Sequence, residues 1–153
     1  MAADQGNIAA EVRRVPNADW FHVDVMDNHF APNMGFSAAA LKSVADLKQA
    51  PIDAHLMIEN PENFLKTFIE AGADSLTFHA EATKKIDECI DIIKSSNKRV
   101  GIAIKPNTPF NEIKQYLNKI DMVLVMTVDP GFSGQGFLAN QVEKIREVRK
   151  EID

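Results

Sequence analysis

The chain has 153 residues, of which 45% are hydrophobic and 25% are charged, a composition typical of an ordered globular protein and not of a disordered one. The net charge of −5 and the pI near 5.4 argue against a nucleic-acid binder, and no apolar run approaches the roughly 20 residues that cross a bilayer. Because the N-terminus lacks a signal-peptide pattern and the single cysteine, Cys89, cannot form an internal disulfide, we expect a cytoplasmic protein without nucleic-acid or membrane partners.

Strand and helix patterns alternate along the chain. Short apolar or alternating runs bounded by turn residues predict five strands, at 20–26, 52–57, 74–79, 99–104 and 121–128. Apolar residues at helical spacing predict six helices, at 7–15, 37–48, 61–71, 84–94, 110–117 and 140–150. Ser37 and Thr83 are candidate N-caps. Cys89 lies on an apolar helix face, which favours a core residue over a nucleophile.

This alternation indicates an α/β fold. Strands that alternate with helices of about 10–12 residues form parallel sheets with right-handed crossovers. Two such folds compete, an open doubly wound sheet and part of a (β/α)8 barrel. No linker or low-complexity segment interrupts the chain, so we expect residues 1–153 to form a single domain.

Polar residues gather towards the carboxyl ends of the predicted strands, where parallel α/β folds place their sites. The first strand carries His22 and Asp24 on one face, and the second carries His55 near its end. Two imidazoles and one carboxylate are normal ligands of a divalent metal and leave positions open for substrate or water. The alternative for the first pair is a histidine that hydrogen-bonds its neighbouring aspartate. His79, which ends the third strand, is either a support for this group or simply buried.

Methionines and a glycine-rich loop occupy the same edge. Met26, Met57 and Met126 all stand at strand ends and together suggest an apolar wall, although each alone is an ordinary core residue. A loop between the fifth strand and the last helix allows backbone N–H groups to approach an anion, and contains Gly131, Phe132, Ser133 and Gly134. A tight turn without a ligand is the alternative.

These motifs, in this order and spacing, resemble the ribulose-phosphate 3-epimerase family over nearly the whole chain. The segments that carry the resemblance are His22-Val-Asp-Val-Met-Asp27, Phe30-Ala-Pro-Asn33, Asp53-Ala-His-Leu-Met-Ile-Glu-Asn-Pro61, Ala71-Gly-Ala-Asp74, Phe78-His-Ala-Glu-Ala-Thr83 and Met126-Thr-Val-Asp-Pro-Gly-Phe-Ser-Gly-Gln135. Relatives that act on a phosphorylated hexulose, such as allulose-6-phosphate 3-epimerase, share much of this pattern.

The resemblance implies a (β/α)8 TIM barrel and a pentose phosphate pathway isomerase that inverts C3 of D-ribulose 5-phosphate through an enediolate. It implies one divalent metal ion (zinc, iron(II), manganese or cobalt) on His22, Asp24 and His55, with Asp24 also a catalytic acid/base. It implies that the substrate-binding residues, besides His55, are Met26, Met57, Met126, Gly131, Phe132, Ser133 and Gly134. A sugar phosphate is then the partner, together with further copies of the chain in a homo-oligomer.

The same resemblance implies that the sequence is truncated at both ends relative to the family. A Val-Asp-Gly-Gly segment with a second catalytic aspartate would follow Asp153, and most of a first strand would precede Met1. We therefore expect an incomplete barrel of about five parallel strands with two unpaired edges, and place the full activity of these residues in doubt. An inactive fragment that acts as a binding or regulatory partner is the alternative function.

Overall fold

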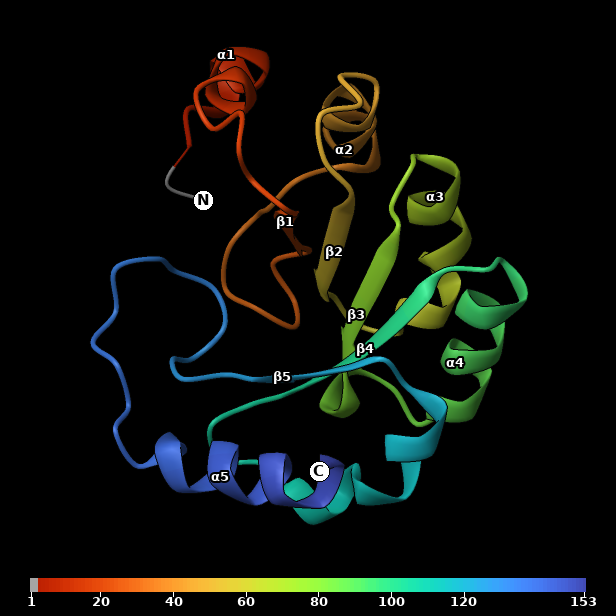
Figure 1. Cartoon of the computed structure of the whole chain (residues 1–153), viewed down its shortest axis with the longest axis vertical. Coiled ribbons are helices and arrows are strands. Elements are labelled where there is room, and N and C mark those ends of the chain that lie inside the picture. The colour runs from red at the N-terminus through yellow and green to blue at the C-terminus, as the bar shows by residue number, and fades with distance from the viewer. Residues whose placement is uncertain (1–2) are drawn as a thin grey trace.

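The computed structural model describes residues 3–153, and a five-stranded parallel sheet forms its centre. The strands are β1 (Phe21–Met26), β2 (Ile52–Met57), β3 (Ser75–His79), β4 (Arg99–Ile104) and β5 (Met122–Val125). They lie side by side in the order β1-β2-β3-β4-β5 (Figure 1). A doubly wound sheet reverses its order at a switch point, whereas each strand of a (β/α)8 barrel lies beside the preceding one. The order decides between the two predicted folds in favour of the barrel.

The helices lie along one side of this curved sheet (Figure 1). They are α1 (Ile8–Arg13), α2 (Ala38–Ala45), α3 (Leu65–Glu70), α4 (Ile86–Ser95) and α5 (Gln141–Ile152). Short 3-10 helices complete the connections, at Gln5–Asn7, Pro61–Asn63, Ala80–Ala82, Phe110–Glu112 and Lys114–Lys119. None of the helices among the described residues is long and apolar enough to span a membrane.

Two predictions about helices are wrong. The α-helix predicted at 110–117 is two 3-10 helices, because its backbone bonds run from Ile113 N–H to Phe110 and from Tyr116 N–H to Ile113, three residues apart. Thr83 does not cap α4, which begins at Ile86; its hydroxyl instead accepts the N–H of Lys85. Ser37 does cap α2, since its hydroxyl accepts the N–H of Ala40 at 3.2 Å.

The two faces of the sheet differ in chemistry. The face towards the helices is apolar and fully buried, and its members include Val25, Leu56, Leu76, Phe78, Ile102 and Ile104. Cys89 of α4 packs into this core, where burial raises the pKa of its thiol to about 12, which confirms it as a core residue. The opposite face carries small and polar side chains. Gly101 there allows close approach of Thr77, because a Cβ at Gly101 would lie 2.3 Å from Thr77 Oγ1.

The outer edge of β1 is covered in part by the chain that follows it, so the expectation of two fully unpaired edges is wrong at this edge. The backbone N–H of Phe36 donates to Asp24 O at 2.9 Å, and that of Gly35 donates to Met26 O at 3.2 Å. A side chain at Gly35 would prevent this, since its Cβ would lie 2.5 Å from Asp24 O. The loop 27–36 is thereby held against the strand that carries the candidate site.

Candidate functional site

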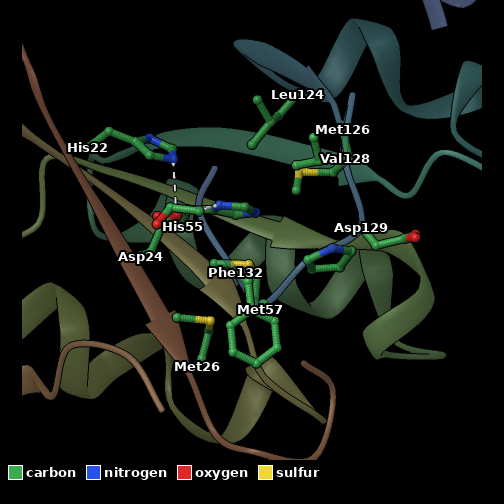
Figure 2. A pocket seen from close by; sticks show the side chains of 13 residues that line it. His22, Asp24, Met26, His55, Met57, Leu124, Met126, Val128, Asp129 and Phe132 are labelled. Atoms are coloured by element: carbon green, nitrogen blue, oxygen red, sulfur yellow. Dashed lines mark hydrogen bonds and ion pairs between the residues drawn. The ribbon is translucent and has the colours of Figure 1, made fainter. Parts of the chain in front are cut away.

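A pocket of about 240 Å³ opens at the carboxyl side of the sheet, between β1, β2 and the loop that follows β5 (Figure 2). Three sets of side chains form it: polar groups from β1 and β2, methionines from the strand ends, and the loop after β5. Its lining residues are His22, Asp24, Met26, His55, Met57, Leu124, Met126, Val128, Asp129, Pro130, Gly131, Phe132 and Ser133. All but one of the residues predicted from the sequence are in this set; Gly134 is exposed beside the pocket and does not line it.

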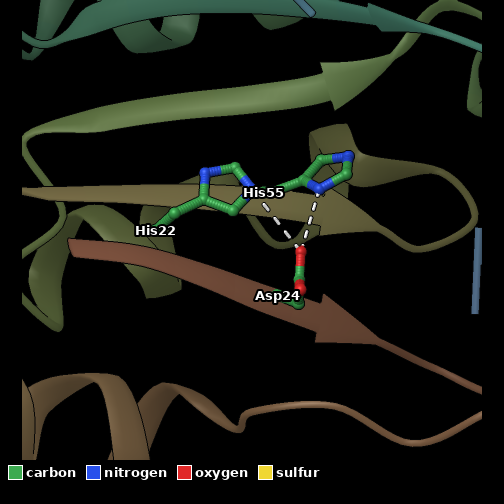
Figure 3. Close-up of side chains that lie close together, drawn as sticks. All are labelled: His22, Asp24 and His55. Atoms are coloured by element: carbon green, nitrogen blue, oxygen red, sulfur yellow. Dashed lines mark hydrogen bonds and ion pairs between the residues drawn. The ribbon is translucent and has the colours of Figure 1, made fainter. Parts of the chain in front are cut away.

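The carboxylate of Asp24 lies between two imidazole rings (Figure 3). Asp24 Oδ1 is 3.0 Å from His55 Nδ1 and 3.5 Å from His22 Nε2. One ligand atom from each of the three residues lies within 4.8 Å of the other two, close enough for a single ion to bind all three. Strand register explains the group, because Asp24 pairs with His55 across β1 and β2, and His22 precedes Asp24 by two residues on the same face.

The position of His22 differs from the prediction in two respects. It is the second residue of β1, well before the carboxyl end of that strand. Its side chain is 46% exposed, whereas that of His55 is 3% exposed. The difference arises because β1 is at the edge of the sheet, whereas β2 lies between β1 and β3. Side chains at different depths therefore converge on Asp24.

Hydrogen bonding sets the charges of this group. The bonds of His22 to Asp24 and Asp53 raise the pKa of the imidazole to about 9. Burial raises the pKa of Asp24, but the hydrogen bonds from His22 and His55 outweigh it, so the pKa lies well below its ordinary range. At neutral pH the ion-free group is an ionised carboxylate beside a protonated imidazole. A cation that binds here would replace the proton on His22 Nε2.

Each imidazole is backed by a further polar group that the sequence reasoning did not assign. His22 Nδ1 lies 2.8 Å from Asp53 Oδ2, and Thr77 Oγ1 donates to Asp53 Oδ1 at 2.9 Å. Burial raises the pKa of Asp53, but the hydrogen bonds from His22 and from the neighbouring hydroxyls outweigh it, so the net shift of the pKa is downward. A carboxylate behind a ligating imidazole is a common feature of metal sites.

His55 is backed differently, by the residue whose role the sequence left open. His55 Nε2 lies 2.9 Å from His79 Nε2, and His79 Nδ1 lies 3.2 Å from Glu81 Oε2. Burial lowers the pKa of His79 to about 4. Burial raises the pKa of Glu81, but hydrogen bonds from His79 and Thr108 outweigh it and bring the value to about 2. His79 therefore supports His55. The sequence signal for this role was the position of His79 at the end of β3, two residues before Glu81.

Two loops far apart in sequence are tied together at the mouth of the pocket. The side-chain amide of Asn33 donates to the carbonyl of Gly131 at 2.7 Å. Gly131 has a φ of +133°, and a Cβ there would lie 3.0 Å from Cδ of Pro32. Glycine is needed at this position both for the backbone conformation and for the close approach of the two loops.

Besides Asp24, Asp129 is the one carboxylate among the described residues that lines the pocket. Figure 2 shows its carboxylate directed away from the group formed by His22, Asp24 and His55. Asp24 is thus the carboxylate that faces the centre of the pocket, on the side of β1.

Comparison with known proteins identifies the family of the chain. The model of the "Ribulose-phosphate 3 epimerase family" matches residues 1–153. The chain belongs to this family. The ribulose-phosphate 3-epimerase of Mycobacterium leprae (strain TN) is 41% identical over 153 residues, which are 100% of this chain and 68% of the relative. The "Ribulose-phosphate 3-epimerase, cytoplasmic isoform" of Oryza sativa subsp. japonica is 39% identical over 157 residues, covering 99% of this chain and 69% of the relative.

Structural comparison agrees at the level of the fold. A 3-keto-L-gulonate-6-phosphate decarboxylase from Vibrio cholerae O1 biovar El Tor superposes with a TM-score of 0.69 at 18% identity, over 94% of this chain and 66% of that one. The five strands and their helices are therefore a portion of a TIM-barrel fold. Membership of the ribulose-phosphate 3-epimerase family makes the chain an isomerase of the carbohydrate epimerase class.

Proposed function

We propose that the chain inverts C3 of D-ribulose 5-phosphate to give D-xylulose 5-phosphate, in a reaction that depends on a divalent metal. One observation carries this proposal: in a fold of the epimerase family, His22, Asp24 and His55 converge within 4.8 Å in a pocket at the carboxyl side of the sheet. The pocket provides a cation site and a base in the same place, and removal of a proton beside a ketone needs both.

The residues present fit a divalent cation. Two imidazole nitrogens and a carboxylate form a donor set that suits zinc, iron(II), manganese or cobalt. The second nitrogen of His22 is already bonded to Asp53 and that of His55 to His79, which leaves His22 Nε2, Asp24 and His55 Nδ1 as the ligand atoms. When bound, the cation supplies Lewis-acid stabilisation of the negative charge that develops on the substrate oxygens.

Asp24 acts as the base. Its low pKa keeps the carboxylate ionised and ready to accept the C3 proton on the face of the substrate nearest to β1. Loss of that proton converts the ketose phosphate to an enediolate, and addition of a proton to the opposite face of C3 completes the inversion. Retention of configuration results if Asp24 returns the same proton to the same face.

The other pocket residues bind the substrate. Met26 and Met57 pack together beneath the polar group, and Met126 lines the pocket across from them, so the planar enediolate meets soft apolar walls. The loop from Gly131 to Gly134 follows β5 and offers backbone N–H groups to the phosphate. Asn33 holds this loop in place through Gly131.

The group formed by His22, Asp24 and His55 favours this enzymatic role over an inactive binding partner. A binding module does not need a carboxylate between two imidazoles that are themselves held by further hydrogen bonds. The protonation on the second face of C3 requires a further acid, and Asp129 is directed away from the site. Proton exchange at C3 and net inversion are therefore separate activities of the same pocket and are measured separately.

The experiment uses the purified chain with added zinc, manganese or iron(II) and ribulose 5-phosphate in deuterated water. Mass spectrometry and NMR follow deuterium at C3 of the recovered substrate and formation of xylulose 5-phosphate. Metal-dependent product supports the whole proposal, and deuterium in recovered substrate without product supports the base and the cation site but not inversion by these residues. If the folded chain gives neither product nor deuterium at C3, the proposal is overturned. A faster reaction with allulose 6-phosphate than with ribulose 5-phosphate reassigns the substrate.

We further propose that residues 1–153 form one domain and that copies of the chain associate as a homo-oligomer. We also propose that the chain acts in the cytoplasm, because its rice relative is named a cytoplasmic isoform. The continuous core behind β1–β4 supports the first point. Two exposed aromatic rings between β5 and α5, Phe132 at 58% and Phe137 at 60%, support the association of copies. Light scattering of the purified chain checks the association, and a monomer at all concentrations contradicts it.

A further inference from the structure

A continuous line of polar contacts runs from the pocket into the interior behind His55. His55 Nδ1 faces Asp24 at 3.0 Å, and His55 Nε2 faces His79 Nε2 at 2.9 Å. On its far side, His79 Nδ1 faces Glu81 Oε2 at 3.2 Å. The side chains of His55 and His79 are 3% and 0% exposed, so each ring nitrogen must be satisfied by the protein group that it faces.

The protons along this line are fixed by what each group can donate. Two ring nitrogens in contact need one donor and one acceptor. Glu81 Oε1 accepts the backbone N–H of Lys105 at 2.7 Å and also the hydroxyl of Thr108, as a carboxylate does. Its other oxygen, Oε2, therefore accepts a proton from His79 Nδ1.

The neutral form of His79 then has a lone pair at Nε2. A second proton would place a cation on a fully buried ring, which burial disfavours. Since His79 Nε2 accepts, His55 donates to it from Nε2. The other nitrogen, His55 Nδ1, faces the ionised carboxylate of Asp24 and donates to it in the ion-free chain. A divalent cation that binds both Asp24 and His55 would take the place of this Nδ1 proton and leave the proton on Nε2.

We propose that His79 and Glu81 are positioning residues that hold a proton on His55 Nε2, so that a divalent cation displaces the proton on Nδ1 and binds that nitrogen. This inference rests on the cation site of the proposed function and extends it to a pair of residues that do not touch the cation. The two imidazoles are prepared by different means. His22 is backed directly by Asp53, whereas His55 is backed by a carboxylate acting through a second imidazole.

The substitution Glu81→Gln tests this without a change of shape. The side-chain oxygen of the glutamine is required by the Lys105 N–H, so its NH₂ group faces His79 Nδ1. His79 then accepts at Nδ1 and carries its proton on Nε2. His55 must then accept at Nε2, so its one proton stays on Nδ1, where it opposes a cation. Thr108→Val is the matched control, because it removes one donor to Glu81 but leaves the Glu81–His79 contact.

The first measurement is zinc binding to the tag-free chain by calorimetry, without substrate. Loss of a group that supports a metal ligand commonly weakens binding by about 10–100-fold, and we expect a loss in this range for Glu81→Gln and at most a two-fold change for Thr108→Val. Equal affinity of folded Glu81→Gln and the unmodified chain would overturn the inference.

The second measurement identifies the ring nitrogen of His55 that binds zinc, from imidazole ¹⁵N shifts of the zinc-loaded chain. Zinc on Nδ1 with a proton on Nε2 is expected, and zinc on Nε2 overturns the inference. A folded chain that binds no zinc, manganese or iron(II) overturns the proposed metal-dependent function together with this inference, whereas equal zinc affinity of Glu81→Gln overturns this inference alone.

Discussion

Asp24 on β1 and His55 on β2 are register partners, and their side chains meet at 3.0 Å between Asp24 Oδ1 and His55 Nδ1. The contact joins adjacent parallel strands, so the rigid sheet holds it, whereas the proposed substrate-binding residues after β5 lie on a loop. The proposed base and cation ligand therefore need little rearrangement during the reaction. The following predictions depend on this pair and the groups around it.

Replacement of Asp24 by asparagine keeps the shape of the side chain and removes the base. We expect metal-dependent deuterium exchange at C3 to fall by at least about 100-fold, the usual contribution of a positioned general base, with weaker zinc binding and a native circular dichroism spectrum. Asp46→Asn is the control, since Asp46 forms a surface ion pair with Lys42 on α2. Exchange that survives in Asp24→Asn would assign the base to another residue.

The stability of the metal-free chain should pass through a maximum near pH 6.5. Burial lowers the pKa of His79 from 6.5 to about 4, so between these values the unfolded state binds more protons and stability rises with pH. The bonds to Asp24 and Asp53 raise the pKa of His22 from 6.5 to about 9, so stability falls again over that range. The second change is the smaller because nearly half of the His22 side chain is exposed.

Urea unfolding in the presence of a chelator, at several pH values between about 5 and 9, measures this dependence. In His22→Asn the decrease above pH 6.5 should disappear, while the rise below it remains. A free energy of unfolding that increases steadily to pH 9 in the unmodified chain would contradict the assignment of a protonated His22.

Replacement of Asn33 by alanine removes the side-chain bond to the Gly131 carbonyl. A lost hydrogen bond of this kind costs about 1 kcal/mol, so we expect the KM for ribulose 5-phosphate to rise about three- to ten-fold, with unchanged zinc affinity. Asn17→Ala, at an exposed position before β1, is the control. A change in zinc affinity with unchanged KM would show that Asn33 supports the cation site and not the substrate loop.

Glycine 101 tests the packing behind His22. The Cβ of Gly101→Ala would lie 2.3 Å from Thr77 Oγ1, and Thr77 is a donor to Asp53. We expect a loss of about 1–3 kcal/mol in the free energy of unfolding, together with weaker zinc binding. The same substitution at Gly136, whose Cβ would meet no atom within 4 Å, should change neither. Equal effects at both glycines would argue against a strained contact at Gly101.

The sequence was sufficient for the existence of the five strands and for the three residues of the central group, although the fifth strand, predicted at 121–128, spans only Met122–Val125. Strand 52–57 was predicted with its final bounds, because apolar residues flanked by turn residues fix a buried strand locally. The group followed from side-chain alternation and from the resemblance, since His22 and Asp24 share a face and β2 follows in the sheet. The prediction failed where two local structures have similar energy. At 110–117 the choice between an α-helix and 3-10 helices depends on packing with the rest of the fold.

Contacts across strands were beyond the sequence reasoning. Alternation on β3 places Thr77 and His79 on the inner face, but it does not say that one meets Asp53 and the other meets His55. The exposure of His22 likewise depends on the position of β1 at the edge of the sheet. These features come from the three-dimensional register of strands that are 20 or more residues apart.

The most direct test of the proposed cation site is a crystal structure of the chain soaked with zinc, with anomalous diffraction at the zinc edge. We expect a single strong peak about 2.0–2.2 Å from His22 Nε2, an Asp24 carboxylate oxygen and His55 Nδ1, with His55 Nε2 still in contact with His79. A peak elsewhere, or an ion bound without Asp24, would contradict the proposed site and the mechanism that follows from it.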